Sequence, residues 1–207
     1  LPRYRTFLEL EKATLSPEYN TIILTISNMQ TRQFAESYGI SANRMHLVPP
    51  GMDEHCWRPK DENIAQEIRL KCRNELGMDN NSIGIVIVAT NFQLKGGDRL
   101  LNAVASLTDN LRMQCHIIVI GNDRLDATKL AREISTPVNH IHILGHRNDV
   151  GNWLLAADLM LHPARQECAG SALIEGLAAG IPVICTENCG FSPIVKHCNT
   201  FTVQQYF

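Results

Sequence analysis

The sequence lacks a long hydrophobic run, an excess of charge of either sign and a dense set of cysteines. Its longest apolar stretch, Ile83–Ala89, is far shorter than the roughly 18–20 residues that a membrane-spanning helix needs. The 19 lysines and arginines against 21 aspartates and glutamates give a net charge of -2, whereas nucleic-acid-binding proteins usually carry a basic excess. These absences exclude transmembrane, collagen-like and disordered classes, and they argue against a nucleic-acid partner.

Seven cysteines are scattered through 207 residues, whereas a disulfide framework packs them more densely into a shorter chain. We interpret them as reduced thiols of a cytoplasmic protein. Cys185 and Cys189, followed by His197 and Cys198, leave zinc binding open as a weaker alternative, because no second ligand pair has the spacing of a zinc site.

The sharpest break in the chain is Pro49-Pro50-Gly51, where two prolines oppose a helix and the glycine permits a turn. Before this break the pattern predicts a helix, a strand, a helix and a strand, at residues 3–15, 21–26, 28–38 and 45–48. Four elements are too few to bury a core of their own. Both chain ends look cut, so we interpret the sequence as a piece of a longer protein, with domains at residues 1–50 and 51–207.

After a helix at residues 63–76, apolar runs alternate with helical stretches from Ser82 onward. We expect strands at residues 83–89, 115–120, 140–144, 159–162, 183–185 and 200–203. We expect helices near residues 98–107, 125–134, 149–157, 170–179 and 192–196. Near-continuous runs of isoleucine, valine and leucine are typical of strands covered on both faces. The sequence therefore predicts an α/β fold, a Rossmann-like doubly wound parallel sheet.

Ligands bind beyond the carboxyl ends of the strands in such a sheet. Lys95 follows the first of these strands, Glu167 follows the fourth, and Gly170 begins a helix, so we expect them to share one rim. A helix start offers free N–H groups and a positive dipole end, which suit a phosphate. Glu175, one turn after Ser171, is placed to accept hydrogen bonds from sugar hydroxyls.

Each of these residues also has a structural interpretation. A lone lysine such as Lys95 is more often a solvated surface residue, whereas Glu175 lies among apolar neighbours, where a carboxylate is costly without partners. His162 ends an apolar strand and is more readily explained as structural, with a role in the site left open. Three histidines are interpreted as strand-edge residues rather than metal ligands: His140, His142 and His146.

Several motifs together resemble the retaining family-4 glycosyltransferases. Residues 167–175, ECAGSALIE, have the E-x7-E form of that family, and residues 176–184, GLAAGIPVI, resemble its continuation. Further matches follow the family's order: VPPGMD at 48–53, Lys95-Gly96, AADL at 156–159 and His162-Pro163. The resemblance covers essentially the whole chain. Residues 147–150 and 162–167 look most similar to the lipopolysaccharide-core glucosyltransferases, type I.

The resemblance implies a GT-B fold, in which two Rossmann-like domains face each other across a cleft. Residues 1–50 would end the N-terminal acceptor domain, and residues 51–207 would be the nucleotide-sugar donor domain, truncated at its C-terminus. The implied reaction moves a hexose, glucose, from a UDP-sugar to a lipopolysaccharide-core or related glycan acceptor, with retention of configuration and without a metal. The implied location is the cytoplasm, with peripheral association at a bacterial inner membrane through the missing N-terminal domain.

The resemblance also implies roles for individual residues. Lys95 would neutralise the leaving diphosphate and Glu167 would hold donor-sugar hydroxyls, so these are the candidate catalytic residues. Glu175 would grip the ribose, and the loop at residues 147–150 would meet the base. The candidate donor-binding residues are Asn91, Gly96, Arg147, Val150, Cys168, Ala169, Gly170, Ser171, Ala172, Leu173 and Glu175.

The sequence departs from the family at Leu94, because an arginine commonly precedes the lysine there. Arg99 and Arg165 are the candidates to compensate. With the acceptor domain incomplete, we expect the 207-residue chain alone to bind donor weakly and turn over little or nothing.

Three other functions are less consistent with the sequence. A nucleotide-sugar-binding module without catalysis is consistent with Leu94. A dinucleotide oxidoreductase would need G-x-G-x-x-G after a strand, and residues 90–95, TNFQLK, do not match. A glycoside hydrolase needs two carboxylates facing each other at ~5–9 Å across a cleft, whereas Glu167 and Glu175 flank a helix start.

Overall fold

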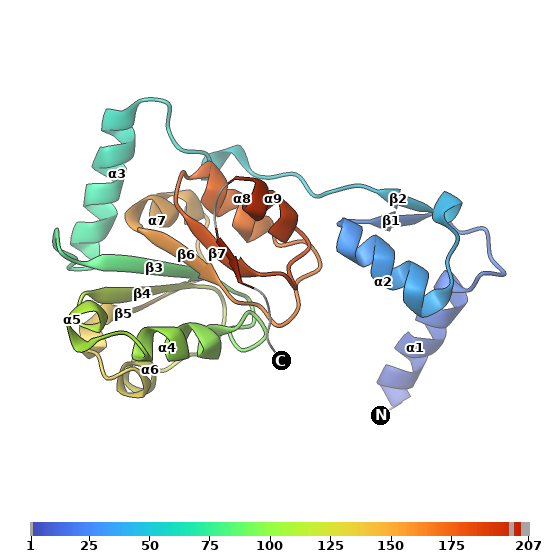
Figure 1. The fold of residues 1–207 in the computed structure, drawn as a ribbon, viewed down its shortest axis with the longest axis horizontal. Coiled ribbons are helices and arrows are strands. Elements are labelled where there is room, and N and C mark those ends of the chain that lie inside the picture. The colour runs from blue at the N-terminus through green and yellow to red at the C-terminus, as the bar shows by residue number, and fades with distance from the viewer. Residues whose placement is uncertain (1, 199–200, 204–207) are drawn as a thin grey trace. The chain divides into compact units, whose positions relative to one another are not determined.

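The computed structural model describes residues 2–198 and 201–203. The chain divides into two compact units, Leu1–Gly51 and Met52–Phe207. Figure 1 shows the helices and strands of each unit. In the described part of the chain, no helix combines the length and the apolar character that crossing a membrane requires.

The first unit is a small α/β arrangement built from α1 (Pro2–Leu15), β1 (Ile23–Thr25), α2 (Asn28–Tyr38), a 3-10 turn (Ala42–Arg44) and β2 (Met45–Leu47). Its two strands pair in parallel. The Ser27 side chain accepts a hydrogen bond from the Gln30 N–H and caps α2, as an N-cap serine does. Leu15, Ile23 and Ile40 form its buried apolar cluster.

The second unit contains a parallel sheet of six strands. In chain order these are β3 (Ile83–Val88), β4 (Cys115–Ile120), β5 (Ile141–Gly145), β6 (Leu159–His162), β7 (Val183–Thr186) and β8 (Phe201–Val203). In space their order is β5-β4-β3-β6-β7-β8, and every neighbouring pair is parallel. The prediction of a Rossmann-like parallel α/β sheet is confirmed. Thr200, placed in the last strand by the sequence pattern, lies outside the described residues.

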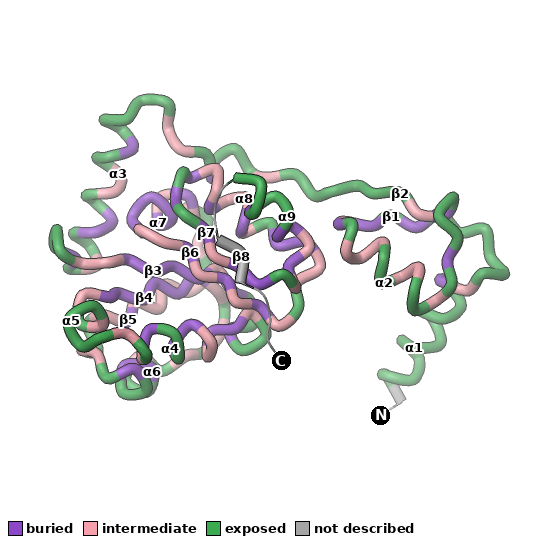
Figure 2. Tube along the Cα trace, viewed as in Figure 1, coloured by how far each residue is buried: buried purple, intermediate pink, exposed green. Residues whose placement is uncertain are grey.

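Helices cover both faces of this sheet. They are α3 (Glu62–Glu75), α4 (Gly97–Ala105), α5 (Asp109–Arg112), α6 (Ala127–Glu133), α7 (Val150–Ala156), α8 (Ser171–Ala178) and α9 (Ser192–His197), with 3-10 turns at Glu54–Cys56 and Val138–His140. Apolar side chains of α4 and α6 pack with Ile87 and Ile117, while Val86 and Ile118 point to the opposite face and are equally buried. Figure 2 shows the buried residues concentrated along the central strands.

The carboxylate of Asp158 ties α3 to the sheet. It accepts hydrogen bonds from the Gly84 N–H at 2.8 Å and from Arg73 Nη1 at 3.0 Å, and it also pairs with Arg69. The Arg73 side chain is nearly buried and also donates to the Ser82 carbonyl at 2.7 Å. Burial by itself raises the pKa of Asp158, but the Gly84 N–H and the two arginines lower it below its usual range. Asp158, the aspartate of the AADL motif at residues 156–159, therefore has a structural role.

Two histidines of the sheet contact each other away from the ends where ligands bind. His116 Nδ1 lies 2.9 Å from His142 Nε2, and the His140 ring stacks on His116 with centroids 4.0 Å apart. Burial, aided by neighbouring histidines, lowers the pKa of His116 and of His142 to about 4. Among the described residues, no three His, Cys, Asp or Glu side chains are arranged to hold a metal ion. No disulfide joins any of the seven cysteines.

Replacing Asp158 with asparagine should lower the free energy of unfolding by about 2–3 kcal/mol, because it leaves the charge of nearly buried Arg73 without its carboxylate. The measurement is urea denaturation followed by circular dichroism. Asp109→Asn is the matched control, because Asp109 also pairs with an arginine but is 89% exposed, and it should change stability by less than about 0.5 kcal/mol. Equal effects of the two substitutions would contradict the assignment.

The histidine pair should make stability fall with acid between pH 6.5 and pH 4. Since the pKa of each histidine is about 4 when folded and 6.5 as its ordinary value, the unfolded chain binds more protons in that window and stability decreases as the pH falls. Replacing both His116 and His142 with glutamine should remove about 2–4 kcal/mol of this pH-dependent loss. Urea denaturation at pH 7, 5.5 and 4 measures it; His197→Gln, an exposed histidine, should keep the parent profile.

Candidate functional site

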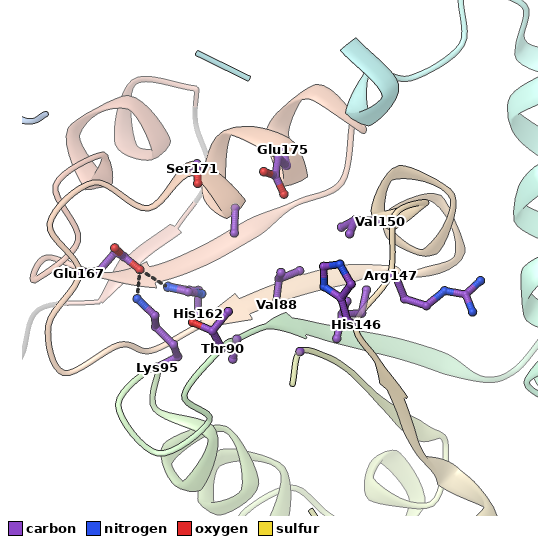
Figure 3. A pocket seen from close by; sticks show the side chains of 14 residues that line it. Val88, Thr90, Lys95, His146, Arg147, Val150, His162, Glu167, Ser171 and Glu175 are labelled. Carbon is purple, nitrogen blue, oxygen red and sulfur yellow. Dashed lines mark hydrogen bonds and ion pairs between the residues drawn. The ribbon is translucent and has the colours of Figure 1, made fainter. Parts of the chain in front are cut away.

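A pocket of about 400 Å³ opens at the carboxyl ends of the strands in the second unit. Its wall is formed by Val88, Ala89, Thr90, Lys95, Ile120, Gly121, His146, Arg147, Val150, His162, Glu167, Ser171, Ala172 and Glu175 (Figure 3). The strand order reverses between β3 and β6, and the connections at such a switch point diverge and leave a crevice. The pocket therefore lies where the topology of the sheet predicts a ligand site.

Lys95, Glu167 and His162 meet at one side of the pocket (Figure 3). Lys95 Nζ forms an ion pair with Glu167 Oε2, and both side chains are 17% exposed. His162 Nε2 lies 3.7 Å from the same oxygen, and its side chain is 1% exposed. Burial by itself raises the pKa of Glu167, but the neighbouring His162 ring and the Lys95 ammonium lower it to about 2. Glu167 is therefore a carboxylate at neutral pH.

The start of α8 forms a second side of the pocket. Gly170 precedes the helix with φ 93°, a conformation that residues other than glycine rarely adopt. Ser171 and Ala172 follow in the pocket wall, in the first turn of the helix, where backbone N–H groups have no partner within the helix. The small side chains leave that positive end of the helix open to an anion.

Glu175 faces the pocket from the second turn of α8 (Figure 3). Burial, together with the charge of Asp53, raises the pKa of Glu175 above its usual range. Gly176, the next residue, has no room for a side chain, because a Cβ there would lie 2.7 Å from Met160 Sδ. Close packing of α8 on β6 and β7 therefore fixes the position of Glu175.

The Arg147 guanidinium is turned away from the pocket centre (Figure 3). It donates two hydrogen bonds of 2.8 Å to the Asp149 carboxylate and lies 5.0 Å from the centre of the Trp153 ring. Arg147 lines the pocket with the rest of its side chain, beside Val150. The Asp149 carboxylate and the Trp153 ring therefore hold the guanidinium, and this part of the wall is formed by His146, Val150 and the rest of Arg147.

Seven of the candidate catalytic and donor-binding residues lie in the pocket wall: Lys95, Arg147, Val150, Glu167, Ser171, Ala172 and Glu175. Six others lie outside it: Asn91, Gly96, Cys168, Ala169, Gly170 and Leu173. Asn91 Oδ1 accepts the Leu94 N–H in a turn, and a Cβ on Gly96 would lie 2.0 Å from the Pro163 carbonyl oxygen. Leu173 is fully buried and its N–H donates to the Gly170 carbonyl. Asn91 and Gly96 therefore shape the loop before α4, and Leu173 anchors the start of α8 in the core.

Thr90, Gly121 and His146 also line the pocket, although they were not among the predicted site residues and His146 was interpreted as a strand-edge histidine. Each follows a strand end, which is the signal that could have found them. Gly121 also marks a close approach, because a Cβ there would lie 1.6 Å from the Ala89 carbonyl oxygen. His162, for which a structural role was preferred, lies in the wall.

Neither arginine that could compensate for Leu94 lies in the pocket wall. Arg165 forms two hydrogen bonds with the Asp98 carboxylate, at 2.7 and 2.6 Å. Arg99 Nη1 donates to the Pro163 carbonyl at 3.3 Å. Both guanidinium groups instead connect the start of α4 with the loop that follows β6.

Comparisons with known proteins agree on one family. Residues 69–206 match the family model described as glycosyl transferases group 1. The lipopolysaccharide glucosyltransferase WaaG of Escherichia coli K12 is 32% identical over 97% of this chain and 53% of that protein. A D-inositol 3-phosphate glycosyltransferase of Xylanimonas cellulosilytica is 28% identical over 80% of this chain and 41% of that protein. The chain thus spans about half the length of the curated relatives it matches.

Solved structures give the same result for the fold. A crystal structure of WaaG, described as a glycosyltransferase involved in lipopolysaccharide biosynthesis, matches with a TM-score of 0.88 and 31% identity, over 100% of this chain and 55% of that one. Anabaena Alr3699/HepE in complex with UDP-glucose matches with a TM-score of 0.78, over 99% of this chain and 56% of that one. Its 20% identity shows a shared fold alone.

Lys95→Met should raise the pKa of Glu167 well above 2, because burial then acts without the ammonium that opposes it. Carbon-13 NMR titration of the glutamate carboxyls measures this pKa directly.

At pH 7 the Lys95→Met variant should also lose about 1.5–3 kcal/mol of stability. Since the low folded pKa stabilises the parent above pH 4.5 and this contribution is lost as the pH falls towards 2, the difference between the two proteins should shrink in acid. Exposed Lys129→Met is the control; an unchanged Glu167 pKa in Lys95→Met would contradict the pairing.

Proposed function

This chain belongs to the group 1 glycosyltransferases, and from that membership we propose that it carries the donor site of an enzyme that transfers glucose from a UDP-sugar to a lipopolysaccharide-core or related glycan acceptor. The membership confirms the resemblance seen in the sequence, and the fold is that of GT-B glycosyltransferases such as WaaG. The choice of glucose and of this acceptor is supported by the name of the relative at 32% identity. UDP as the carrier is supported by the UDP-glucose bound to Alr3699/HepE.

The observation that carries the proposal is the convergence of Lys95, Glu167 and the start of α8 on one pocket. An ammonium group and free helical N–H groups form a site for a diphosphate. Glu167, on the same side of the pocket as Lys95, accepts hydrogen bonds from hydroxyls of the attached sugar. Glu175, further along α8, accepts hydrogen bonds from the ribose.

The same groups supply the electrostatics of the transfer. Negative charge develops on the diphosphate as its bond to the sugar breaks, and donors fixed in advance at that position lower the barrier. In this proposal Lys95 and the first turn of α8 provide that stabilisation without a metal. The acceptor hydroxyl attacks the face from which the diphosphate leaves, so the configuration of the sugar is retained.

The two units take different parts in the proposal. The unit Met52–Phe207 is the donor domain, and Leu1–Gly51 is the end of the acceptor domain. Because the chain spans about half of its relatives, the acceptor site and any peripheral contact with the inner face of a membrane belong to the rest of a cytoplasmic enzyme. The chain by itself binds the donor weakly and turns over little.

A nucleotide-sugar-binding module without catalysis is the second candidate. Leu94 stands where the family commonly has an arginine, and Arg99 and Arg165 are held by Pro163 and Asp98. The Lys95 ammonium would then be the formal positive charge that the described pocket wall offers to the diphosphate. Binding of UDP is common to both candidates, and only turnover by the complete enzyme separates them.

Thermal unfolding in the presence of UDP, UDP-glucose and NAD tests the donor site. A ligand at 100 times its dissociation constant adds about 2.7 kcal/mol of stability, so UDP and UDP-glucose should raise the melting temperature and NAD should not. Glu175→Ala should abolish or strongly reduce the shift, because it removes the proposed ribose acceptor.

Glu187→Ala, which changes an exposed loop carboxylate outside the pocket, is the matched control and should keep the full shift. A shift with NAD instead of UDP would contradict the proposed function. So would an equal shift in the parent and the Glu175→Ala variant.

A further inference from the structure

His162 is a buried polar side chain whose nearest acidic group, the Glu167 carboxylate, lies just beyond hydrogen-bond distance. It is 1% exposed, lines the pocket, and neither ring nitrogen has a hydrogen-bond partner among the described residues. Leaving a buried donor or acceptor without a hydrogen bond is unfavourable, and buried polar groups are rarely left so. Its Nε2 lies 3.7 Å from Glu167 Oε2, beyond the 2.7–3.2 Å typical of a hydrogen bond. A shift that shortens this distance by about half an ångström would therefore give His162 a hydrogen-bond partner.

The backbones of Glu167 and His162 are held in place, which leaves their side chains free to adjust. His162 ends β6, where it pairs with Cys185 of β7. The Glu167 N–H donates to the Asn188 carbonyl at 3.1 Å, and the Glu167 carbonyl accepts the Gly190 N–H at 2.9 Å. A small rotation of the Glu167 side chain is enough to bring its carboxylate within reach of His162.

Lys95 is the partner that is able to leave. Its long side chain has four rotatable carbon–carbon bonds and extends from the loop before α4. In this structure the Lys95 ammonium is paired with Glu167 (Figure 3). In the proposed function the same ammonium binds the diphosphate. The two roles compete, because turning to the phosphate weakens the contact with Glu167.

We propose that His162 is a positioning residue that replaces Lys95 as the partner of the Glu167 carboxylate when the Lys95 ammonium moves to the donor diphosphate. In its Nε2-protonated tautomer, His162 then donates a hydrogen bond to Glu167 Oε2. This inference rests on the proposed function, since it requires a diphosphate in the pocket.

The exchange removes a cost that donor binding otherwise carries. Without it, Glu167 would be a largely buried carboxylate with no partner beside an anionic ligand, which is unfavourable. With it, the carboxylate keeps a hydrogen bond and stays aimed at the position of the sugar. His162 acts through Glu167 and has no need to touch the ligand.

A double-mutant cycle on UDP affinity tests the exchange, with the 207-residue chain and isothermal titration calorimetry. His162→Asn keeps a polar group but reaches only the Nδ1 position, so UDP affinity should fall by about tenfold. His162→Gln carries an amide to the position of Nε2 and should recover most of that loss. Glu167→Gln removes the charge that needs a partner, so in that background His162→Asn should change UDP affinity by less than twofold.

Glu167→Gln alone should strengthen UDP binding, because Lys95 is no longer held by a carboxylate and UDP carries no sugar for Glu167 to hold. Circular dichroism melts of each variant without ligand show that it is folded, and the glutamine variant supplies the comparison if the asparagine variant does not fold. An equal loss from His162→Asn in both backgrounds, or no recovery by glutamine, would overturn the exchange while leaving the UDP site intact. Failure of the parent chain to bind UDP would overturn the proposed function, and this inference with it.

Discussion

The site depends on one constraint, the reversal of strand order between β3 and β6. After β3 the chain adds β4 and β5 on one side, and then returns to add β6, β7 and β8 on the other. The loops after β3 and β6 therefore leave the sheet in different directions, and the pocket lies between them. Lys95 comes from the first loop and Glu167 from the second, 72 residues later. The Asp158 carboxylate keeps β3 and β6 in this arrangement, because it bonds to the Gly84 N–H of one strand and precedes the other.

In and around the pocket, the lysine and two of the arginines are already paired with carboxylates. Lys95 neutralises Glu167, and Asp149 and Asp98 occupy the guanidinium groups of Arg147 and Arg165. A preformed pair keeps each group in position, but it also means that an anion has to compete for the lysine. The helix start at Ser171 has no such competitor, since its N–H groups are backbone donors in the first turn. The first contact of a diphosphate is therefore expected at α8, with Lys95 following.

The sequence predicted the elements of this unit well because both faces of the sheet are buried. β4 and β6 match their predicted bounds, and the other strands differ by a residue or so. The short α5 was missed, since four residues carry no usable periodicity. Topology placed Lys95 and Glu167 on one rim, but it could not separate Ser171, which faces the pocket, from Leu173, which faces the core. The sequence also could not predict that Arg147 pairs with Asp149, because that pairing depends on the rotamer of the arginine side chain.

The pocket wall carries little positive charge. With Arg99 and Arg165 engaged elsewhere, the described wall sets the Lys95 ammonium against two carboxyls, Glu167 and Glu175. Burial and the charge of Asp53 raise the pKa of Glu175 above its usual range, so its charged form is the disfavoured one in this wall. With both carboxyls ionised, the wall would carry more negative than positive charge, which opposes the binding of a diphosphate. If the pocket binds a donor as proposed, its diphosphate has to draw Lys95 away from Glu167, so a residue that makes this release easier would strengthen donor binding without contacting the donor.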